Sequence, residues 1–194
     1  MNRKFLWMAM AILLLVVIVA LVYVVVNPRT QGFNGSIINP PFPADDFSLT
    51  SQTQQTIHLS DYRGKYVLLF FGFTNCTEEC PLTMGYLKQV HDRLKDQADK
   101  IQVIMITTDP ARDDPSALGA FLAHFDPSFI GLTSSKSDLQ SVWTDYGVTV
   151  LDNGETHSSF VYLIDTQGNL IMTYPNLQNA DGITADLQRL MRGK

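Results

Sequence analysis

Apolar and polar positions divide this chain into one long uncharged run and a series of shorter segments. Phe5–Val26 holds 22 residues without a charge and follows a short N-terminus that carries Arg3 and Lys4. A helix needs about 20 apolar residues to cross a bilayer core, so we expect a transmembrane anchor over residues 1–26. Basic residues before a span favour a cytoplasmic N-terminus. A single pass through the cell membrane would then place the rest of the chain outside the cytoplasm.

A cleaved signal peptide is the alternative interpretation of this run. The apolar core of a signal peptide usually has about 7–15 residues and ends at a small-residue cleavage site. The run here is longer, and no Ala-x-Ala pattern or nearby cysteine follows it. A lipoprotein anchor is therefore excluded. Proline and glycine are frequent in residues 27–43, which predicts a linker to a domain spanning residues 44–194.

The rest of the chain alternates between strand and helix patterns. Phe47–Thr50 and Thr56–Ser60 alternate apolar with polar residues and predict a β-hairpin. Continuous apolar runs at Tyr66–Gly72 and Ile101–Thr107 are typical of buried parallel strands. We predict helices at 81–98, 115–124, 137–146 and 181–191, and further strands at 129–133, 160–164 and 170–174. This order indicates an α/β fold whose sheet is parallel in the middle and closes with an antiparallel hairpin.

Charge excludes one class of partner. The residues after position 26 include 12 basic and 19 acidic side chains, a net charge of −7. A protein that binds nucleic acid usually presents a basic surface to the phosphates. We therefore expect no nucleic acid partner.

The two cysteines of the chain lie where a strand turns into a helix. Cys76 follows the predicted strand by a few residues, and Cys80 precedes Pro81, a residue well suited to the first turn of a helix. Partial positive charge at a helix N-terminus favours the thiolate, the form that binds soft metals and attacks disulfides. Glu78 and Glu79 lie between the cysteines and oppose this effect by raising a thiol pKa. A strand–helix junction with such a pair fits a thioredoxin-like fold.

The spacing of these cysteines leaves several interpretations open. Residues four apart on a helix have Cβ atoms about 5–6 Å apart, whereas a disulfide needs about 3.5–4.5 Å. A modest adjustment of the turn would allow a reversible disulfide, and the same separation suits two sulfurs on one metal ion. Two buried cysteines that only fill the core, or a structural disulfide, remain the alternatives.

A two-sulfur metal site needs a third ligand, and histidine is the natural candidate. His157 ends a polar loop just before the strand at 160–164. Loops at one edge of a parallel sheet converge, so His157 is a candidate ligand, with a plain surface residue as the alternative. His91 is expected on a helix surface, His124 in a helix end, and His58 within the N-terminal hairpin.

Four stretches of the sequence carry a resemblance to a known family. Lys65–Pro81, with its C-x3-C-P motif, resembles the signature of the Sco (SenC) family, copper proteins of cytochrome c oxidase assembly. Thr108–Asp113 is similar to the D-P-x-R-D motif of that family, and Phe129–Thr133 and His157–Asp165 are similar to its later blocks. The resemblance extends over about residues 44 to 192, and the predicted anchor also matches. Departures at Asn75, Thr77 and Glu78 leave the expected ligands unchanged.

The resemblance implies a copper site made of Cys76, Cys80 and His157. Two thiolates and a neutral imidazole balance Cu(II) and leave a charge of −1 on Cu(I), so one site could hold either state. Thiolates select copper over hard cations, and a structural zinc would want four ligands. The implied role is a copper chaperone that serves the dinuclear copper subunit of cytochrome c oxidase and receives copper from an upstream donor. Asp109 and Arg112 would be supporting residues that orient His157 or close over the metal, with chain turning and helix capping as the alternative.

A second function uses the same cysteines. Cys76 and Cys80 could form the redox pair of a thiol–disulfide reductase that keeps the cysteines of the oxidase copper site reduced. Only the copper carrier requires His157. A peroxidase of thioredoxin fold is disfavoured because it needs a thiol of low pKa, and Glu78 and Glu79 work against one. Met84, one turn after Cys80, is expected to pack in the core rather than to bind metal.

Overall fold

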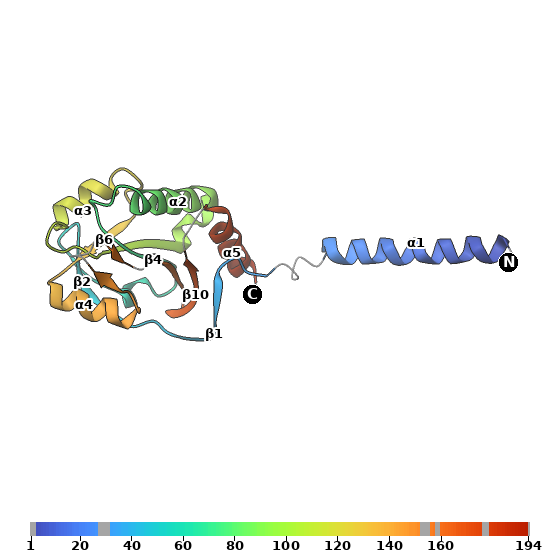
Figure 1. The fold of residues 1–194 in the computed structure, drawn as a ribbon, viewed down its shortest axis with the longest axis horizontal. Coiled ribbons are helices and arrows are strands. Elements are labelled where there is room, and N and C mark those ends of the chain that lie inside the picture. The colour runs from blue at the N-terminus through green and yellow to red at the C-terminus, as the bar shows by residue number, and fades with distance from the viewer. Residues whose placement is uncertain (1–2, 27–31, 152–155, 158–159, 176–178, 194) are drawn as a thin grey trace. The chain divides into compact units, whose positions relative to one another are not determined.

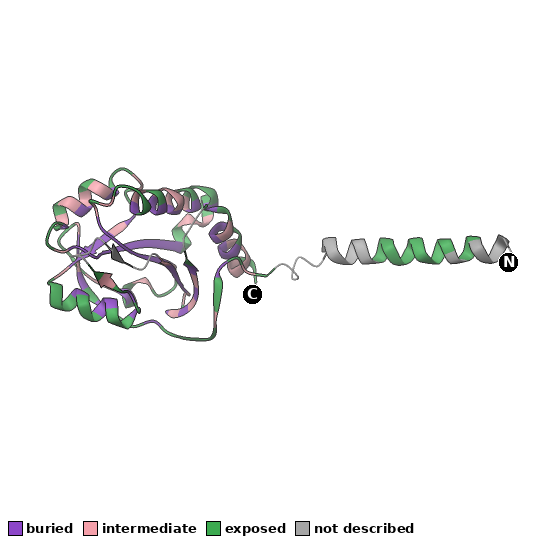
Figure 2. Cartoon of the chain, viewed as in Figure 1, coloured by how far each residue is buried: buried purple, intermediate pink, exposed green. Residues whose placement is uncertain are grey.

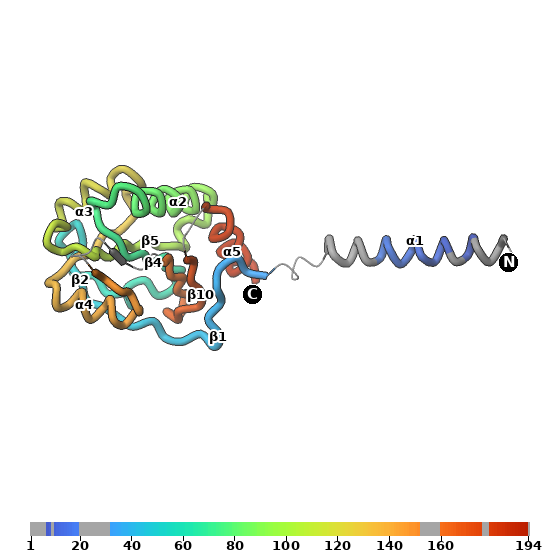
Figure 3. The backbone as a smooth tube through the Cα atoms, in the orientation of Figure 1, coloured from blue at the N-terminus to red at the C-terminus, as the bar shows by residue number. Residues whose placement is uncertain are grey.

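The computed structural model of the chain describes residues 3–26, 32–151, 156–157, 160–175 and 179–193 (Figures 1 and 3). The chain forms two compact units, Met1–Phe33 and Asn34–Lys194. The first contains helix α1 (Arg3–Val26), whose described apolar side chains, such as Trp7 and Leu13, are exposed. Within the described residues, no helix meets the length and apolarity needed to cross a membrane. The helix that we predicted is present, whereas its role as a membrane span is not confirmed.

An eight-stranded mixed sheet organises the second unit. Its strands are β1 (Ser36–Pro43), β2 (Ser48–Ser51), β3 (Thr56–His58), β4 (Tyr66–Gly72), β5 (Ile101–Thr107), β6 (Ile130–Thr133), β9 (Phe160–Ile164) and β10 (Asn169–Pro175). They lie in the order β1-β10-β9-β4-β5-β6-β2-β3. The β4, β5 and β6 strands are parallel, and the other pairs are antiparallel. The predicted parallel centre, N-terminal hairpin and closing hairpin are confirmed.

Helices cover both faces of this sheet. They are α2 (Glu79–Leu94), α3 (Pro115–Leu122), α4 (Lys136–Asp145) and α5 (Asp181–Arg192), with short 3-10 helices at Leu59–Tyr62 and Lys95–Lys100. Figure 1 shows α2 and α3 on one side of the sheet and α4 on the other. Strands β7 (Val150–Leu151) and β8 (Thr156–His157) pair in a separate two-stranded antiparallel sheet.

The burial of the central strands explains why the sequence predicts them. Every residue of β5 is buried, as are six of the seven in β4 (Figure 2). Alternate side chains of a strand point to opposite faces. Leu69, Phe71 and Ile106 join the cluster that includes Trp143 of α4, and their neighbours along the strands face the helices on the other side. A strand that is buried on both faces is apolar along most of its length.

The expected linker over residues 27–43 differs from the structure at its C-terminal end. Residues 36–43 form β1, which pairs with β10 at the edge of the sheet. Proline cannot donate to a neighbouring strand and is tolerated at edges. The register shifts between Ile37 and Phe42, where the prolines lie. As an edge strand, β1 pairs on one side only and so tolerates prolines. The proline-rich composition therefore predicted a linker where the structure has a strand.

A buried carboxylate joins the start of this unit to its last helix. Asp186 of α5 has no exposed surface. Its oxygens accept hydrogen bonds from the Asn34 backbone (2.9 Å), the Asn34 amide (2.9 Å), the Gly35 N–H (3.0 Å) and the Tyr174 hydroxyl (3.0 Å). Burial, helped by the Asp186 charge, raises the pKa of Tyr174, which keeps this hydroxyl protonated and donating even in alkaline solution. Four donors offset the cost of burying the carboxylate.

Gly72, the last residue of β4, allows α2 to approach the strand closely. A Cβ atom built at Gly72 would lie 2.6 Å from the Phe70 ring and 2.9 Å from the Cys80 sulfur. Neither neighbour has room to move, because both side chains are fully buried. Any larger side chain would push the start of α2 away from the sheet.

We expect Gly72→Ala to lower the free energy of unfolding by about 1–3 kcal/mol, because the added methyl overpacks the contact with Phe70 and Cys80. Urea denaturation of the full chain measures this. Gly85→Ala is the matched control, because a Cβ there meets nothing within 4 Å. Alanine in the middle of α2 should gain up to about 1 kcal/mol through helix propensity. Equal effects of the two substitutions would contradict the packing argument.

We expect Asp186→Asn to cost about 1–3 kcal/mol of stability, because an amide leaves buried donors without an acceptor. Chemical denaturation again provides the measurement. Asp96→Asn, at an exposed position, should change stability by less than about 0.5 kcal/mol. An unchanged free energy of unfolding in Asp186→Asn would show that the carboxylate does not stabilise this end of the domain.

Candidate metal centre

The two cysteines lie at the junction between β4 and α2, as the sequence predicted. Cys76 is in the turn and partly exposed, whereas Cys80 is the second residue of α2 and fully buried. The backbone N–H of Cys80 donates to the Cys76 sulfur at 3.3 Å. Both cysteines are free thiols. The first turn of α2 thus directs a donor at the partly exposed Cys76 sulfur, the outer sulfur. The buried Cys80 sulfur, the inner sulfur, lies against Gly72.

Burial controls the acidity of the inner thiol. Removal from water raises the pKa of Cys80 well above its usual value, and the backbone N–H of Phe73 lowers it by a smaller amount. The Cys76 sulfur and the Glu79 charge also act to raise it, more weakly. Desolvation therefore outweighs the hydrogen bond from Phe73 at this sulfur. A cation bound beside it would favour the thiolate by direct charge attraction.

The strand register brings the segment of His157 to the same end of the sheet as the cysteines. The backbone of His157 in β8 pairs with Val150 of β7, and β9 begins three residues later at Phe160. Val161 of β9 is opposite Phe70 near the end of β4, in an antiparallel pair. β9 therefore starts where β4 ends and the cysteine turn begins. The side chain of His157 lies outside the described part of the chain, so its part as a ligand stays a prediction.

Asp109 and Arg112 lie in the segment after β5, next to the cysteine turn. Asp109 is buried, and Arg112 is exposed and forms an ion pair with it. The Arg112 guanidinium lies 6.0 Å from the centre of the Phe73 ring, three residues before Cys76. The Asp109–Arg112 pair thus lies beside Phe73, at the start of the cysteine turn. Its predicted effect on His157 stays untested, because that imidazole is outside the described residues.

Asp113 is the residue to which the sequence assigned no role. It is fully buried and accepts hydrogen bonds from the Thr74 backbone (3.0 Å), the Thr74 hydroxyl (2.6 Å) and the Thr107 hydroxyl (2.6 Å). The neighbouring Asp114 is the residue that caps α3, by accepting from the Ala117 N–H. The only sequence signal was the position of Asp113 at the end of the D-P-x-R-D motif.

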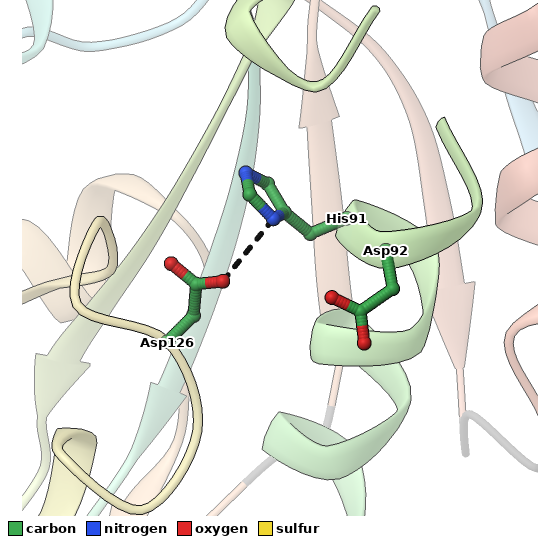
Figure 4. A group of neighbouring side chains, drawn as sticks. All are labelled: His91, Asp92 and Asp126. Carbon is green, nitrogen blue, oxygen red and sulfur yellow. Dashed lines mark ion pairs between the residues drawn. The ribbon is translucent and has the colours of Figure 1, made fainter. Parts of the chain in front are cut away.

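The other histidines have ordinary structural surroundings. His91 of α2 is half-buried, and its Nδ1 lies 3.2 Å from an Asp126 oxygen (Figure 4). Asp92 is near enough to complete a three-residue group that could hold a metal ion, but the Lys88 ammonium already lies 2.7 Å from its carboxylate. His91 also contacts the Phe129 ring edge-on at 5.9 Å.

His124 follows α3 and is exposed, while His58 ends β3. The backbone N–H of His58 donates to Asp61. Met84 is fully buried, as expected for a core residue.

Comparison with solved structures supports the fold and adds relatives. The structure matches Bradyrhizobium japonicum ScoI with copper bound at a TM-score of 0.70 and 29% identity, over 76% of this chain and 99% of that one. It matches apo Sco1 from Thermus thermophilus at a TM-score of 0.73 and 33% identity, over 83% and 98%. The thioredoxin domain of a Bacteroides vulgatus thiol-disulfide oxidoreductase matches at 0.61 with 18% identity, which shows the fold alone. The thioredoxin-like prediction is confirmed.

Sequence comparison points to the same relatives. The chain is 33% identical to the SCO2-like protein of Rickettsia felis over 135 residues, 65% of this chain and 66% of that protein. It is 32% identical to the mitochondrial SCO2 homolog of Mus musculus over 154 residues, 74% of this chain and 60% of that protein. The chain thus spans about two thirds or less of these relatives. The SCO1/SenC family model matches residues 39–192, and the chain therefore belongs to the SCO1/SenC family.

Proposed function

We propose that this protein carries copper, bound through Cys76, Cys80 and His157, to the dinuclear copper centre of a cytochrome c oxidase subunit. The observation that supports it best is the sulfur pair at the β4–α2 junction, with the His157 segment entering the sheet at the same end. A putative copper-binding protein of Stutzerimonas stutzeri is 32% identical over 66% of this chain. The Bradyrhizobium japonicum structure holds copper, and a further relative, BsSco, is described as a member of the Sco family of cytochrome c oxidase assembly proteins.

The chemistry of the donor set suits a cargo ion better than a structural ion. Thiolates favour Cu(I), and imidazole suits both oxidation states of copper. Three protein ligands leave a coordination position open, through which an incoming ligand can attach before the first ones leave. The partly exposed Cys76 is the sulfur that a partner reaches first, whereas Cys80 holds the ion from the buried side.

The proposal includes a location outside the cytoplasm. Uncharged residues make up Phe5–Val26, and the described apolar side chains of α1 are exposed, which supports an anchor in the cell membrane. Residues after α1 would tether the folded unit near a membrane-bound oxidase. An upstream donor would load the copper on the same side.

A thiol–disulfide reductase is the alternative function. In that reaction the Cys76 thiolate attacks a target disulfide and forms a mixed disulfide, releasing one target thiol. Cys80 then gives up its proton and displaces the second target thiol, so the target gains two electrons and Cys76–Cys80 becomes a disulfide. One partly exposed and one buried thiol suit the attacking and resolving roles, and a disulfide switch is named for BsSco, 25% identical over 78% of this chain.

Replacing His157 separates these functions. We expect His157→Ala to weaken copper binding by the full chain at least about tenfold, while both thiols remain titratable, because only the metal site needs the imidazole. A chelator competition with Cu(I) measures the affinity, and His124→Ala is the control at an exposed histidine. Unchanged affinity and normal oxidase assembly in cells carrying His157→Ala would favour the reductase.

Single serine variants test the unequal acidity of the sulfurs. We expect the lone thiol of Cys76→Ser to react with iodoacetamide at least about tenfold more slowly at pH 7.5 than the lone thiol of Cys80→Ser. Burial raises the pKa of Cys80, and only the thiolate is alkylated. The rate for Cys80 should keep rising through pH 9, because its thiolate fraction grows throughout that range. Equal rates in the folded variants would contradict the assigned burial.

A further inference from the structure

We propose that Asp113 is a positioning residue that fixes the cysteine turn to the end of β5 and so holds the two sulfurs at the spacing that copper requires. The proposal rests on the proposed copper function. The described contacts of Asp113 reach the cysteine turn through Thr74, two residues before Cys76. The role is separate from the helix cap of α3, which Asp114 provides.

The first argument is the burial of a charge without a cationic partner among its described contacts. A carboxylate with no exposed surface is costly to bury unless hydrogen bonds satisfy it. Asp113 receives three donors, the Thr74 N–H, the Thr74 hydroxyl and the Thr107 hydroxyl. All three come from segments that follow β4 or end β5. The carboxylate therefore spans the two strand ends at the edge of the sheet that carries the cysteines.

The second argument is that the β5 side of this connection is rigid. The Thr107 hydroxyl also accepts the Asp109 N–H at 2.9 Å, and its carbonyl accepts the Trp143 indole N–H at 3.2 Å. The Thr108 N–H donates to the Gly72 carbonyl at 2.9 Å. Strand β5, helix α4 and the end of β4 thus immobilise Thr107. Because Asp113 bonds both residues, it restrains Thr74 relative to the fixed Thr107.

The third argument compares the lengths of the bonds that hold the cysteine turn. Within the described contacts, the Cys76 N–H donates to the Phe73 carbonyl at 3.4 Å, and the Cys80 N–H donates to the Cys76 sulfur at 3.3 Å. The first of these distances is long for a bond between an N–H and a carbonyl oxygen. The bonds from Thr74 to Asp113 are as short as 2.6 Å. Short bonds to Asp113 therefore restrain Thr74, on the backbone that leads to Cys76.

A second buried carboxylate provides a matched comparison. Asp186 is also fully buried and also accepts backbone and hydroxyl donors, but it serves Asn34, Gly35 and Tyr174 rather than the cysteine turn. Asp186→Asn and Asp113→Asn remove one charge each from similar environments. A purely structural role for Asp113 would make the two variants alike in every property, whereas a positioning role separates them at the sulfurs.

The experiment uses the full chain with either substitution. Stability comes from urea denaturation, and Cu(I) affinity comes from competition with a chromogenic chelator. We expect both variants to lose stability, but only Asp113→Asn to weaken Cu(I) binding, by about 10–100-fold, as is typical when a supporting partner of a metal site is removed. Asp186→Asn should remain within twofold. The sulfur-to-copper charge-transfer band with Cu(II) should shift only for Asp113→Asn.

A metal-free measurement keeps this proposal apart from the copper function. The equilibrium between the dithiol and the Cys76–Cys80 disulfide in glutathione buffers should change at least threefold in Asp113→Asn and less than twofold in Asp186→Asn. If the unsubstituted protein bound no Cu(I), the copper function would fail, and this equilibrium would still decide the role of Asp113.

Thr74→Val provides the test that keeps the carboxylate charge and does not depend on Asp113→Asn folding. It removes one donor, so we expect a three- to tenfold loss of Cu(I) affinity. The control is Thr184→Val, at a buried threonine whose hydroxyl donates to the Ala180 carbonyl. The proposal is overturned if Thr74→Val and folded Asp113→Asn keep the unsubstituted affinity and disulfide equilibrium, or if Asp186→Asn and Thr184→Val lose as much.

Discussion

The contact between Gly72 and the Cys80 sulfur determines how β4 meets α2, and the candidate site depends on that junction. A strand that ends in glycine lets the first turn of a helix lie against its backbone. The inner sulfur then loses its water, and burial raises the pKa of the Cys80 thiol. The outer sulfur, one helical turn earlier, stays within reach of solvent. One packing constraint therefore produces two chemically different sulfurs from two identical side chains.

The parts of the fold that could be predicted from sequence are those in which local pattern and tertiary environment agree. β4 and β5 are buried on both faces, so Tyr66–Gly72 and Ile101–Thr107 are mostly apolar, and both strands were predicted with correct ends. Helix ends were less accurate. α2 ends at Leu94 because the backbone at Lys95 has a positive φ, which no local apolar pattern reveals.

What could not be predicted depends on partners distant in the chain. β1 carries prolines that indicate a linker, and its strand character comes from pairing with β10. Asp113 lies in a loop, and its buried carboxylate binds Thr74, 39 residues away. The cysteines were found because their spacing and the following proline are local signals. His157 was selected partly by family resemblance, and the register of β9 on β4 gives a physical reason why its segment returns to the cysteine end.

The two edges of the sheet limit how another protein could attach to this one. One edge, β1, includes Pro40, Pro41 and Pro43, and the other, β3, has only three residues. Prolines and short lengths are the usual means by which a sheet avoids pairing with a foreign strand. Neither edge offers a continuous row of backbone donors and acceptors to an extended peptide. Recognition of an oxidase subunit would then depend on side chains and turns around the cysteine end rather than on strand addition at either edge.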